Sequence, residues 1–186
     1  MGKRWFKIVI LFSLWGLTSC APGFGNKISL PPISTPVIGH QVDSRTIQMR
    51  PVVDARNLPT LVQIEGRSIV PAQDIGGVVD EAFRTYARAY NWDVRPGTGK
   101  LVSVRVQEWF ADVRPSFPAS TVEARVVLEI EIWSENLILD YRSRYEGSTT
   151  YQHPLMNESK VTWALNDALG FALQEFFSDS RVAPHL

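Results

Sequence analysis

Residues 122–132, with the sequence VEARVVLEIEI, decide the fold because apolar and charged side chains alternate along most of the run. A period of two is typical of a strand with one buried face and one solvated face. The apolar positions are Val122, Ala124, Val126, Leu128, Ile130 and Ile132, and the charged ones are Glu123, Arg125, Glu129 and Glu131. We therefore expect a long strand in an antiparallel sheet with a charged outer face.

A second alternating run, residues 137–146, follows after the short link Ser134-Glu135-Asn136, so the two runs are predicted to form a hairpin. Only registers in which paired residue numbers add to an odd sum bring the apolar faces together. Several such registers place Glu129 or Glu131 opposite Arg142 or Arg144, and each such pair contributes about 0.2 to 1 kcal/mol. Charge complementarity supports the hairpin and leaves its register open.

The preceding run, residues 101–113, changes phase in the middle. Val102, Val104 and Val106 alternate with polar residues, whereas Trp109, Ala111 and Val113 continue one position out of step. A slip of one residue exchanges the two faces of a strand. The sequence therefore predicts either a β-bulge near Gln107 and Glu108 or a change in which face is covered.

Two helices flank these strands. An apolar stripe from Ile75 to Tyr90 follows Asp74, a natural N-cap, and a second stripe from Val161 to Phe177 begins near Asn157 or Ser159. We expect both helices to cover one face of the sheet, which gives an α+β domain spanning residues 46–180 and a tail at 181–186. Residues 46–53 read as a strand with an edge or bulge at Pro51, and residues 61–65 and 68–70 as a short hairpin through Gly66.

The N-terminus reads as a lipoprotein signal peptide over residues 1–19. Lys3, Arg4 and Lys7 precede an apolar stretch that is too short to span a bilayer as a stable helix. The tetrapeptide Leu17-Thr18-Ser19-Cys20 resembles the bacterial lipobox, which implies cleavage between Ser19 and Cys20 and acylation of the Cys20 thiol. The alternative is an ordinary secreted protein whose single cysteine happens to lie near the cleavage site.

Residues 20–45 are rich in proline and glycine and read as a flexible tether between the lipid anchor and the folded domain. Fully extended, such a tether could reach on the order of 80 Å, so the domain need not touch the membrane. The alternative is that residues 28–30 or 36–38 pack on the domain as an edge segment. Ala21 stands where an aspartate would resemble an inner-membrane retention signal, so we expect the periplasmic side of the outer membrane of a Gram-negative bacterium.

The composition excludes several classes of protein. Nineteen basic residues balance 19 acidic ones, which argues against a nucleic-acid binder, and a single cysteine rules out a disulfide framework. His40, His153 and His185 have no second ligand at metal-binding spacing, Gly76-Gly77 lacks a phosphate-loop sequence, and Glu129 and Glu131 are explained by a charged sheet face. We therefore expect no cofactor, no metal site and no enzymatic activity.

The loop between the first two long strands, Arg114-Pro115-Ser116-Phe117-Pro118-Ala119-Ser120, presents one aromatic residue between two prolines. Phe117 is either a contact for a partner at the tip of a stiff hairpin or a cap that folds back onto Trp109 or Phe110.

The chain resembles the YajG-like family of uncharacterised outer-membrane lipoproteins over about residues 75–180. The resemblance rests on Trp109-Phe110-Ala111-Asp112-Val113 and on Tyr141-Arg142-Ser143-Arg144-Tyr145-Glu146-Gly147. It implies a small α+β domain in the cell envelope, and it supplies no catalytic residues because the family has no agreed active site. Two functions are open: a noncatalytic tethered module that binds an envelope partner, or an auxiliary lipoprotein of lipid transport or lipopolysaccharide assembly. An apolar tunnel would favour the second and a closed core the first.

Overall fold

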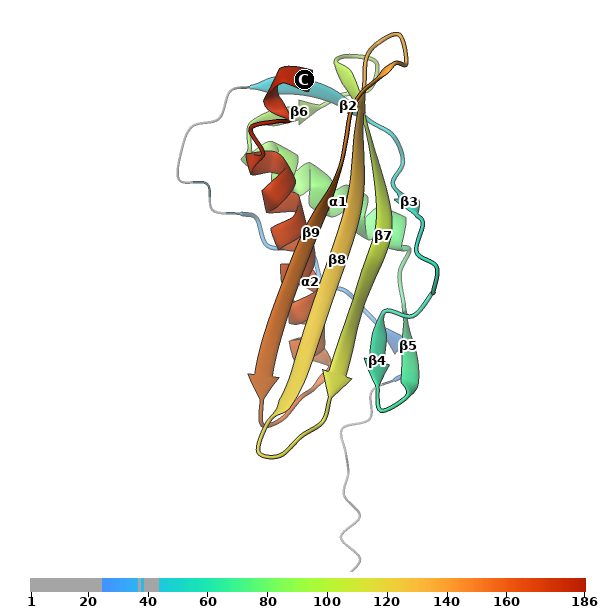
Figure 1. Ribbon diagram of the computed structural model, residues 1–186, viewed down its shortest axis with the longest axis vertical. Helices are drawn as coiled ribbons and strands as arrows, with labels where there is room; N and C mark the ends of the chain where they lie inside the picture. Colours follow the sequence, from blue (N-terminus) through green and yellow to red (C-terminus); the bar gives the residue numbers. More distant parts are fainter. Residues whose placement is uncertain (1–24, 37, 39–43) are drawn as a thin grey trace, which may run out of the picture.

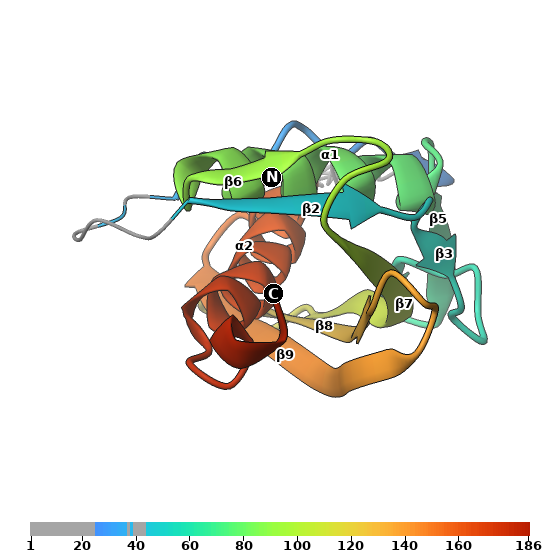
Figure 2. The same cartoon turned by 90° about the horizontal axis from the view of Figure 1, so that it is seen from above.

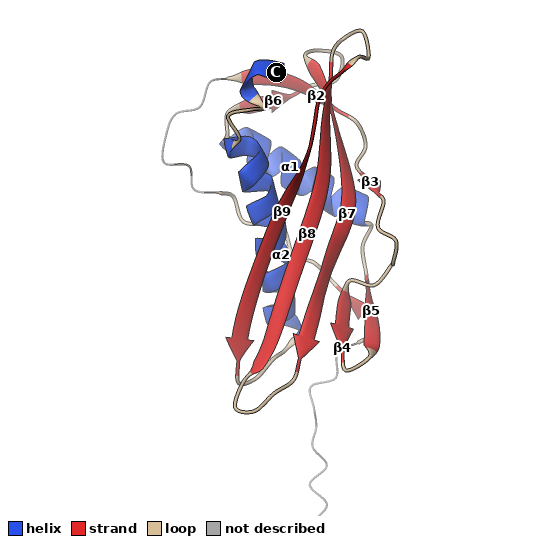
Figure 3. Ribbon diagram, viewed as in Figure 1, coloured by secondary structure: helices blue, strands red, loops and turns tan. Residues whose placement is uncertain are grey.

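The structure, a computed structural model, describes residues 25–36, 38 and 44–186. Its elements are β1 (Lys27–Ile28), β2 (Arg45–Met49), β3 (Val53–Asp54), β4 (Val62–Ile64), β5 (Arg67–Pro71), α1 (Ile75–Ala89), β6 (Trp92–Val94), β7 (Lys100–Arg114), β8 (Ser120–Trp133), β9 (Leu139–His153), α2 (Glu158–Ser178) and the 3-10 helix η1 (Ala183–His185). One mixed sheet and two α-helices confirm the predicted α+β class (Figures 1 and 3). The predicted signal peptide and Cys20 lie outside the described residues.

The long antiparallel strands β7, β8 and β9 form the body of the sheet, and the predicted bulge is present. Val106 pairs with Leu128 and Glu108 with Val127, so Gln107 is the extra residue. The insertion restores the phase of β7, because the apolar residues on both sides of it are buried on the same face: Val102, Val104, Val106, Trp109, Ala111 and Val113.

The β8–β9 hairpin adopts one of the odd-sum registers. Leu128 faces Tyr145, Glu129 faces Arg144 and Glu131 faces Arg142. Strand β9 continues to His153, beyond the alternating run that identified it. The apolar faces therefore meet as expected, and both predicted charge pairs occur in the same register.

The sheet is not purely antiparallel, which corrects the sequence-based expectation. Strands β2, β3 and β4 each run parallel to β7, and β1 runs parallel to β5. Parallel neighbours require a crossover connection, and α1 supplies it by returning the chain between β5 and β6. The run predicted over residues 46–53 is divided into β2 and β3 around Pro51, and β2 lies between β6 and β7 rather than at an edge.

The predicted β4–β5 hairpin is present. Its turn places Glu65 at φ 46° and Gly66 at φ 79°, and two successive positive φ angles match the right-handed twist of a hairpin.

Both helices begin where the capping residues predict. The Asp74 carboxylate accepts a hydrogen bond from the Gly77 amide at 2.8 Å, and the Asn157 side chain accepts one from the Lys160 amide at 3.1 Å. The sheet curls around α2, from β9 through β7 to β2 and β6 (Figure 2). Phe83 of α1 contacts Phe176 and Phe177 of α2, with ring centroids 5.7 and 5.0 Å apart. The helices and the inner sheet face thus share one filled core.

The predicted tether is corrected over residues 27–33. Ile28 pairs with Pro71 and is 1% exposed, and Leu30 is 3% exposed. The Leu30 amide donates to Oε1 of Gln73, and the Asn166 side chain donates to the Pro31 carbonyl. This segment belongs to the domain because its apolar side chains complete the core, as the edge-segment alternative expected.

The predicted tail at 181–186 also packs on the domain. Val182 is 2% exposed, and Nη1 of Arg45 donates to the Ala183 carbonyl at 2.9 Å. Just before it, the Asp179 carboxylate accepts hydrogen bonds from the hydroxyl groups of Tyr141 and Tyr145. The Arg181 guanidinium, which pairs with that carboxylate at 2.8 Å, is the main reason that the pKa of Asp179 lies well below its usual range. The C-terminus is therefore fixed to β9.

The outer face of the sheet is less solvated than expected at one position. Glu131 is 5% exposed, forms an ion pair with Arg142 at 2.5 Å and accepts a hydrogen bond from Nε1 of Trp133 at 3.2 Å. The expectation of a solvated outer face is therefore wrong at Glu131, because neighbouring side chains cover its carboxylate.

Replacing Glu131 with glutamine should lower the free energy of unfolding by about 1 kcal/mol, because a neutral amide weakens charge-assisted hydrogen bonds. Glu129→Gln is the matched control, since Glu129 lies on the same strand face and its contact with Arg144 is loose at 3.7 Å. The control should change stability by less than about 0.5 kcal/mol in a urea titration. Equal losses of stability for the two substitutions would contradict a stabilising role for the buried Glu131 carboxylate.

Candidate binding groove

A surface groove of about 440 Å³ lies where β7 passes the loop between β3 and β4. Strand β3 pairs with Arg105 and Val106, and β4 pairs with residues 111–113 of β7. Among the described residues, no strand pairs with residues 107–110 on this side. The chain bows away from β7 between Ala55, whose amide donates to the Val106 carbonyl, and Leu61, whose carbonyl accepts from the Ala111 amide (Figure 1). The bulge at Gln107 lies in the same gap. The groove is therefore produced by two coinciding irregularities in the sheet.

Arg56 fills the floor of this gap. Its side chain is 5% exposed, its Nε lies 2.8 Å from Oδ1 of Asp54, and its Nη1 donates to the Trp109 carbonyl at 3.3 Å. The guanidinium thus satisfies a β7 carbonyl where the neighbouring strand is missing. Its hydrogen bonds also lower the pKa of Asp54, although partial burial of that carboxyl acts in the opposite direction.

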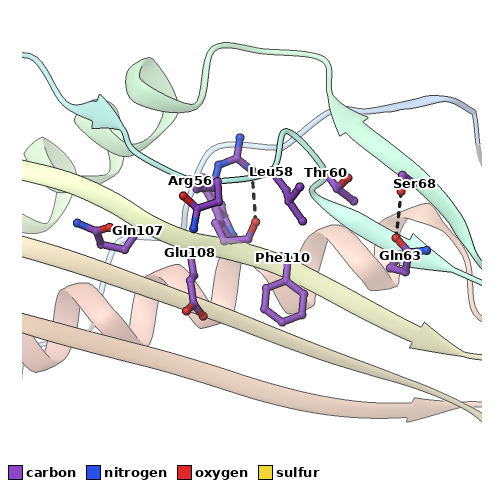
Figure 4. A pocket seen from close by; sticks show the side chains of 10 residues that line it. Arg56, Leu58, Thr60, Gln63, Ser68, Gln107, Glu108 and Phe110 are labelled. Atoms are coloured by element: carbon purple, nitrogen blue, oxygen red, sulfur yellow. Dashed lines mark hydrogen bonds between the residues drawn. The ribbon is translucent and has the colours of Figure 1, made fainter.

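Two exposed apolar side chains stand over the groove, whose base is buried. Leu58 is 69% exposed and Phe110 is 40% exposed. Trp109, whose side chain lies on the inner face of β7, is 1% exposed and donates through Nε1 to the Leu165 carbonyl at 3.2 Å. The groove as a whole is lined by Arg56, Asn57, Leu58, Thr60, Gln63, Ser68, Gln107, Glu108, Trp109 and Phe110 (Figure 4). Two exposed apolar side chains over a fixed floor can receive an apolar side chain of a partner.

A second hollow, of about 430 Å³, lies on the other side of Phe110 and shares Gln63 with the first. It extends over the outer face of β7, β8 and β9, where the charges are paired. Arg125 contacts Glu146 at 2.8 Å and Glu108 at 3.6 Å, and Arg114 contacts Glu123 at 3.0 Å. The hydrogen bond that Arg125 donates to the Glu146 carboxylate is the main cause that raises the pKa of Arg125. This surface is therefore polar, with more carboxylates than guanidinium groups around an exposed aromatic ring.

The groove offers hydrogen-bonding groups and apolar contact. Thr60 and Ser68 carry its hydroxyl groups, and that of Ser68 donates to Oε1 of Gln63 at 3.1 Å (Figure 4). Across residues 25–36, 38 and 44–186, no group of three or more His, Cys, Asp or Glu side chains could hold a metal ion. Within the same ranges, no helix is both long enough and apolar enough to cross a bilayer.

The residues singled out from the sequence lie elsewhere. Ser19, Cys20 and His40 are outside the described residues. Phe117 is 96% exposed on the β7–β8 loop, so the alternative in which it caps the core is wrong. The structure places it outside the groove.

Sequence reasoning missed the groove residues Arg56, Leu58 and Phe110. The phase change that predicted the bulge also turns Phe110 outward and was the available signal for it. Leu58, a single apolar residue between Asn57 and Pro59, carries no periodicity.

Comparisons with known proteins give a family and a related fold. None of the curated proteins compared with the chain matches it. The solved structure of a Xanthomonas campestris protein aligns with a TM-score of 0.58 at 12% identity, covering 81% of this chain and 91% of that one. A minor lipoprotein of Acinetobacter baumannii aligns with a TM-score of 0.44 at 9% identity, covering 73% of this chain and 90% of that one.

The first of these similarities shows a shared fold and, at this identity, nothing about function. A family model described as uncharacterized lipoprotein matches residues 32–186, which is most of the chain. The match covers β2 to η1 and therefore the whole groove. The chain belongs to this family of uncharacterized lipoproteins.

Proposed function

We propose that the protein is a noncatalytic accessory lipoprotein of the YajG-like type, anchored through acylated Cys20 to the periplasmic side of the outer membrane, and that its groove binds an envelope protein. Membership of a lipoprotein family supports the anchor, as does the tetrapeptide that ends at Cys20. The mature chain has 16 basic against 19 acidic residues once Lys3, Arg4 and Lys7 are removed with the signal peptide. Attachment therefore depends on the acyl chains.

The observation that carries the binding role is the pair of exposed apolar side chains, Leu58 and Phe110, over the buried floor of Arg56 and Trp109. A buried floor lowers the conformational cost of binding, and the ion pairs beside Phe110 surround the apolar side chains with polar groups, as in the rim of a protein interface. The partner chemistry that fits is a protein loop with an apolar side chain flanked by polar groups.

The filled core favours this role over that of an auxiliary lipid carrier. A carrier would need an apolar tunnel between the sheet and the helices. That space is occupied by Trp109, Tyr145, Phe83 and Phe176, each less than 2% exposed. Lipid would have to displace these side chains, which already pack against one another.

A photo-crosslinking amino acid in place of Leu58, introduced in intact cells, tests the groove. It should give adducts of discrete mass, and adding Phe110→Ser should lower their yield about tenfold, which corresponds to about 1.4 kcal/mol. The matched control is the same probe in place of Phe171 on α2, which is 49% exposed and lies outside the groove.

The melting temperature of the Phe110→Ser variant should stay unchanged. Identical adducts from both probe positions, or a yield at position 58 that is insensitive to Phe110→Ser, would contradict the proposal.

A further inference from the structure

Two exposed apolar side chains lie at one end of the domain, the lower end in Figure 1. Phe117 on the β7–β8 loop is 96% exposed, and Leu155 on the β9–α2 loop is 76% exposed. The two loops leave the same edge of the sheet, because Ser120 at the start of β8 pairs with His153 at the end of β9.

Both side chains are held outward by their loops. Pro115 and Pro118 flank Phe117 closely and restrict the backbone around it. The Leu155 amide donates a hydrogen bond to Nδ1 of His153 at 3.0 Å, which fixes the turn after β9. Little conformational entropy is therefore lost when these tips enter a new environment.

The N-terminal segment enters the domain from the same end. Lys27 pairs in parallel with Val70, so Gly25 lies level with Ser68. Across the sheet, Ser68 pairs with Gln63 and Gln63 pairs with Asp112 of β7, so Gly25 is also level with Asp112. Arg114, the last residue of β7, is two residues further along the strand, about 7 Å nearer the loop tips.

The distance from Gly25 to Cys20 matches this geometry. Five residues span at most about 18 Å, which exceeds the roughly 7 Å between the level of Gly25 and the end of β7. The opposite tip, between β8 and β9, also exposes apolar side chains, since Leu137 is 61%, Ile138 63% and Leu139 38% exposed. This tip is separated from the lower end by the length of β8, which is 14 residues or about 46 Å. It therefore cannot touch the same membrane surface while the domain stands on the lower loops.

We propose that the lower end of the domain rests on the bilayer surface, with Phe117 and Leu155 inserted between the lipid headgroups beside the acylated Cys20. This inference rests on the lipid anchor of the proposed function. Insertion is driven by apolar contact, because Arg114 is already paired with Asp112 at 2.8 Å and with Glu123 at 3.0 Å. The domain therefore stands upright, with its β8–β9 tip pointing into the periplasm.

Fluorescence quenching in vesicles tests the orientation. The full lipidated chain carries one new thiol, from Phe117→Cys, Leu155→Cys or Ile138→Cys, and Cys20 is blocked by acylation. Each thiol is labelled with bimane, and the protein is reconstituted into phosphatidylcholine vesicles containing lipid with a nitroxide on the upper acyl chain. The labels at 117 and 155 should be quenched, whereas the label at 138 should fluoresce as it does in vesicles without nitroxide.

The possible outcomes distinguish the upright orientation of the domain from the lipid anchor at Cys20. Unquenched labels at 117 and 155 on protein that floats with the vesicles would overturn the upright orientation and leave the lipid anchor intact. Equal quenching at all three positions would also overturn it, because the domain would then lie flat. Protein that fails to float with the vesicles would overturn the anchor and this inference together.

Discussion

Gly147→Ala is expected to lower the free energy of unfolding by more than about 3 kcal/mol, above the usual range for an overpacked core. A Cβ atom at this position of β9 would lie 1.8 Å from the Ala168 carbonyl oxygen and 2.6 Å from the Ala172 amide nitrogen. Both atoms belong to the backbone of α2, so no side-chain rotation relieves the clash. The helix would have to move away from the sheet.

Several contacts resist that movement. The Glu146 amide donates to the Glu175 carboxylate at 3.1 Å, Trp109 donates to the Leu165 carbonyl at 3.2 Å, and Tyr145 donates to Asp179 at 2.9 Å. Displacing α2 lengthens these hydrogen bonds at three points along the helix. Burial and the hydrogen bonds with Tyr141 and Asp179 raise the pKa of Tyr145, so its hydroxyl stays protonated and keeps donating.

A urea titration with two companion variants measures the effect. Ser148→Ala, the next residue on the exposed face of β9, should change stability by less than about 0.5 kcal/mol. Adding Ala168→Gly to Gly147→Ala should not rescue it, because the nearest clash is with the carbonyl oxygen. A loss under about 1 kcal/mol for Gly147→Ala, or full rescue by Ala168→Gly, would show that the approach of α2 to β9 is not as close as described.

Cys20→Ser should move the protein from the membrane fraction to the soluble periplasmic fraction. Each methylene of an acyl chain contributes about 0.8 kcal/mol to membrane binding, and a hydroxyl in place of the thiol cannot receive the diacylglycerol. The two loop tips alone cannot replace that anchor. The measurement is fractionation of cells, with the mass of the mature N-terminus determined in parallel.

Ser19→Ala is the matched control for Cys20→Ser. It keeps a small residue before the cysteine and should leave the protein in the membrane fraction with its lipid attached. A Cys20→Ser variant that still fractionates with the membrane would contradict lipidation as the anchor, and the segment before Gly25 would need another explanation.

The sequence alone determined the features that depend on near neighbours in the chain. Alternation revealed the inner faces of β7, β8 and β9, and the phase change at Gln107 revealed the bulge. Asp74 and Asn157 marked the helix starts, because a cap bonds to an amide only three residues away. These signals are local, so a single sequence contains them.

Only the tertiary structure decided the features that join distant segments. The Asn166 side chain bonds to the Pro31 carbonyl across 135 residues, and this contact helps to fix a segment that its composition alone marked as a flexible tether. The parallel pairing of β2 and β4 with β7 depends on where α1 returns the chain. The groove exists because a gap between β3 and β4 coincides with the bulge in β7. Such contacts are set by packing between elements, and no periodicity along the chain reports which elements will meet.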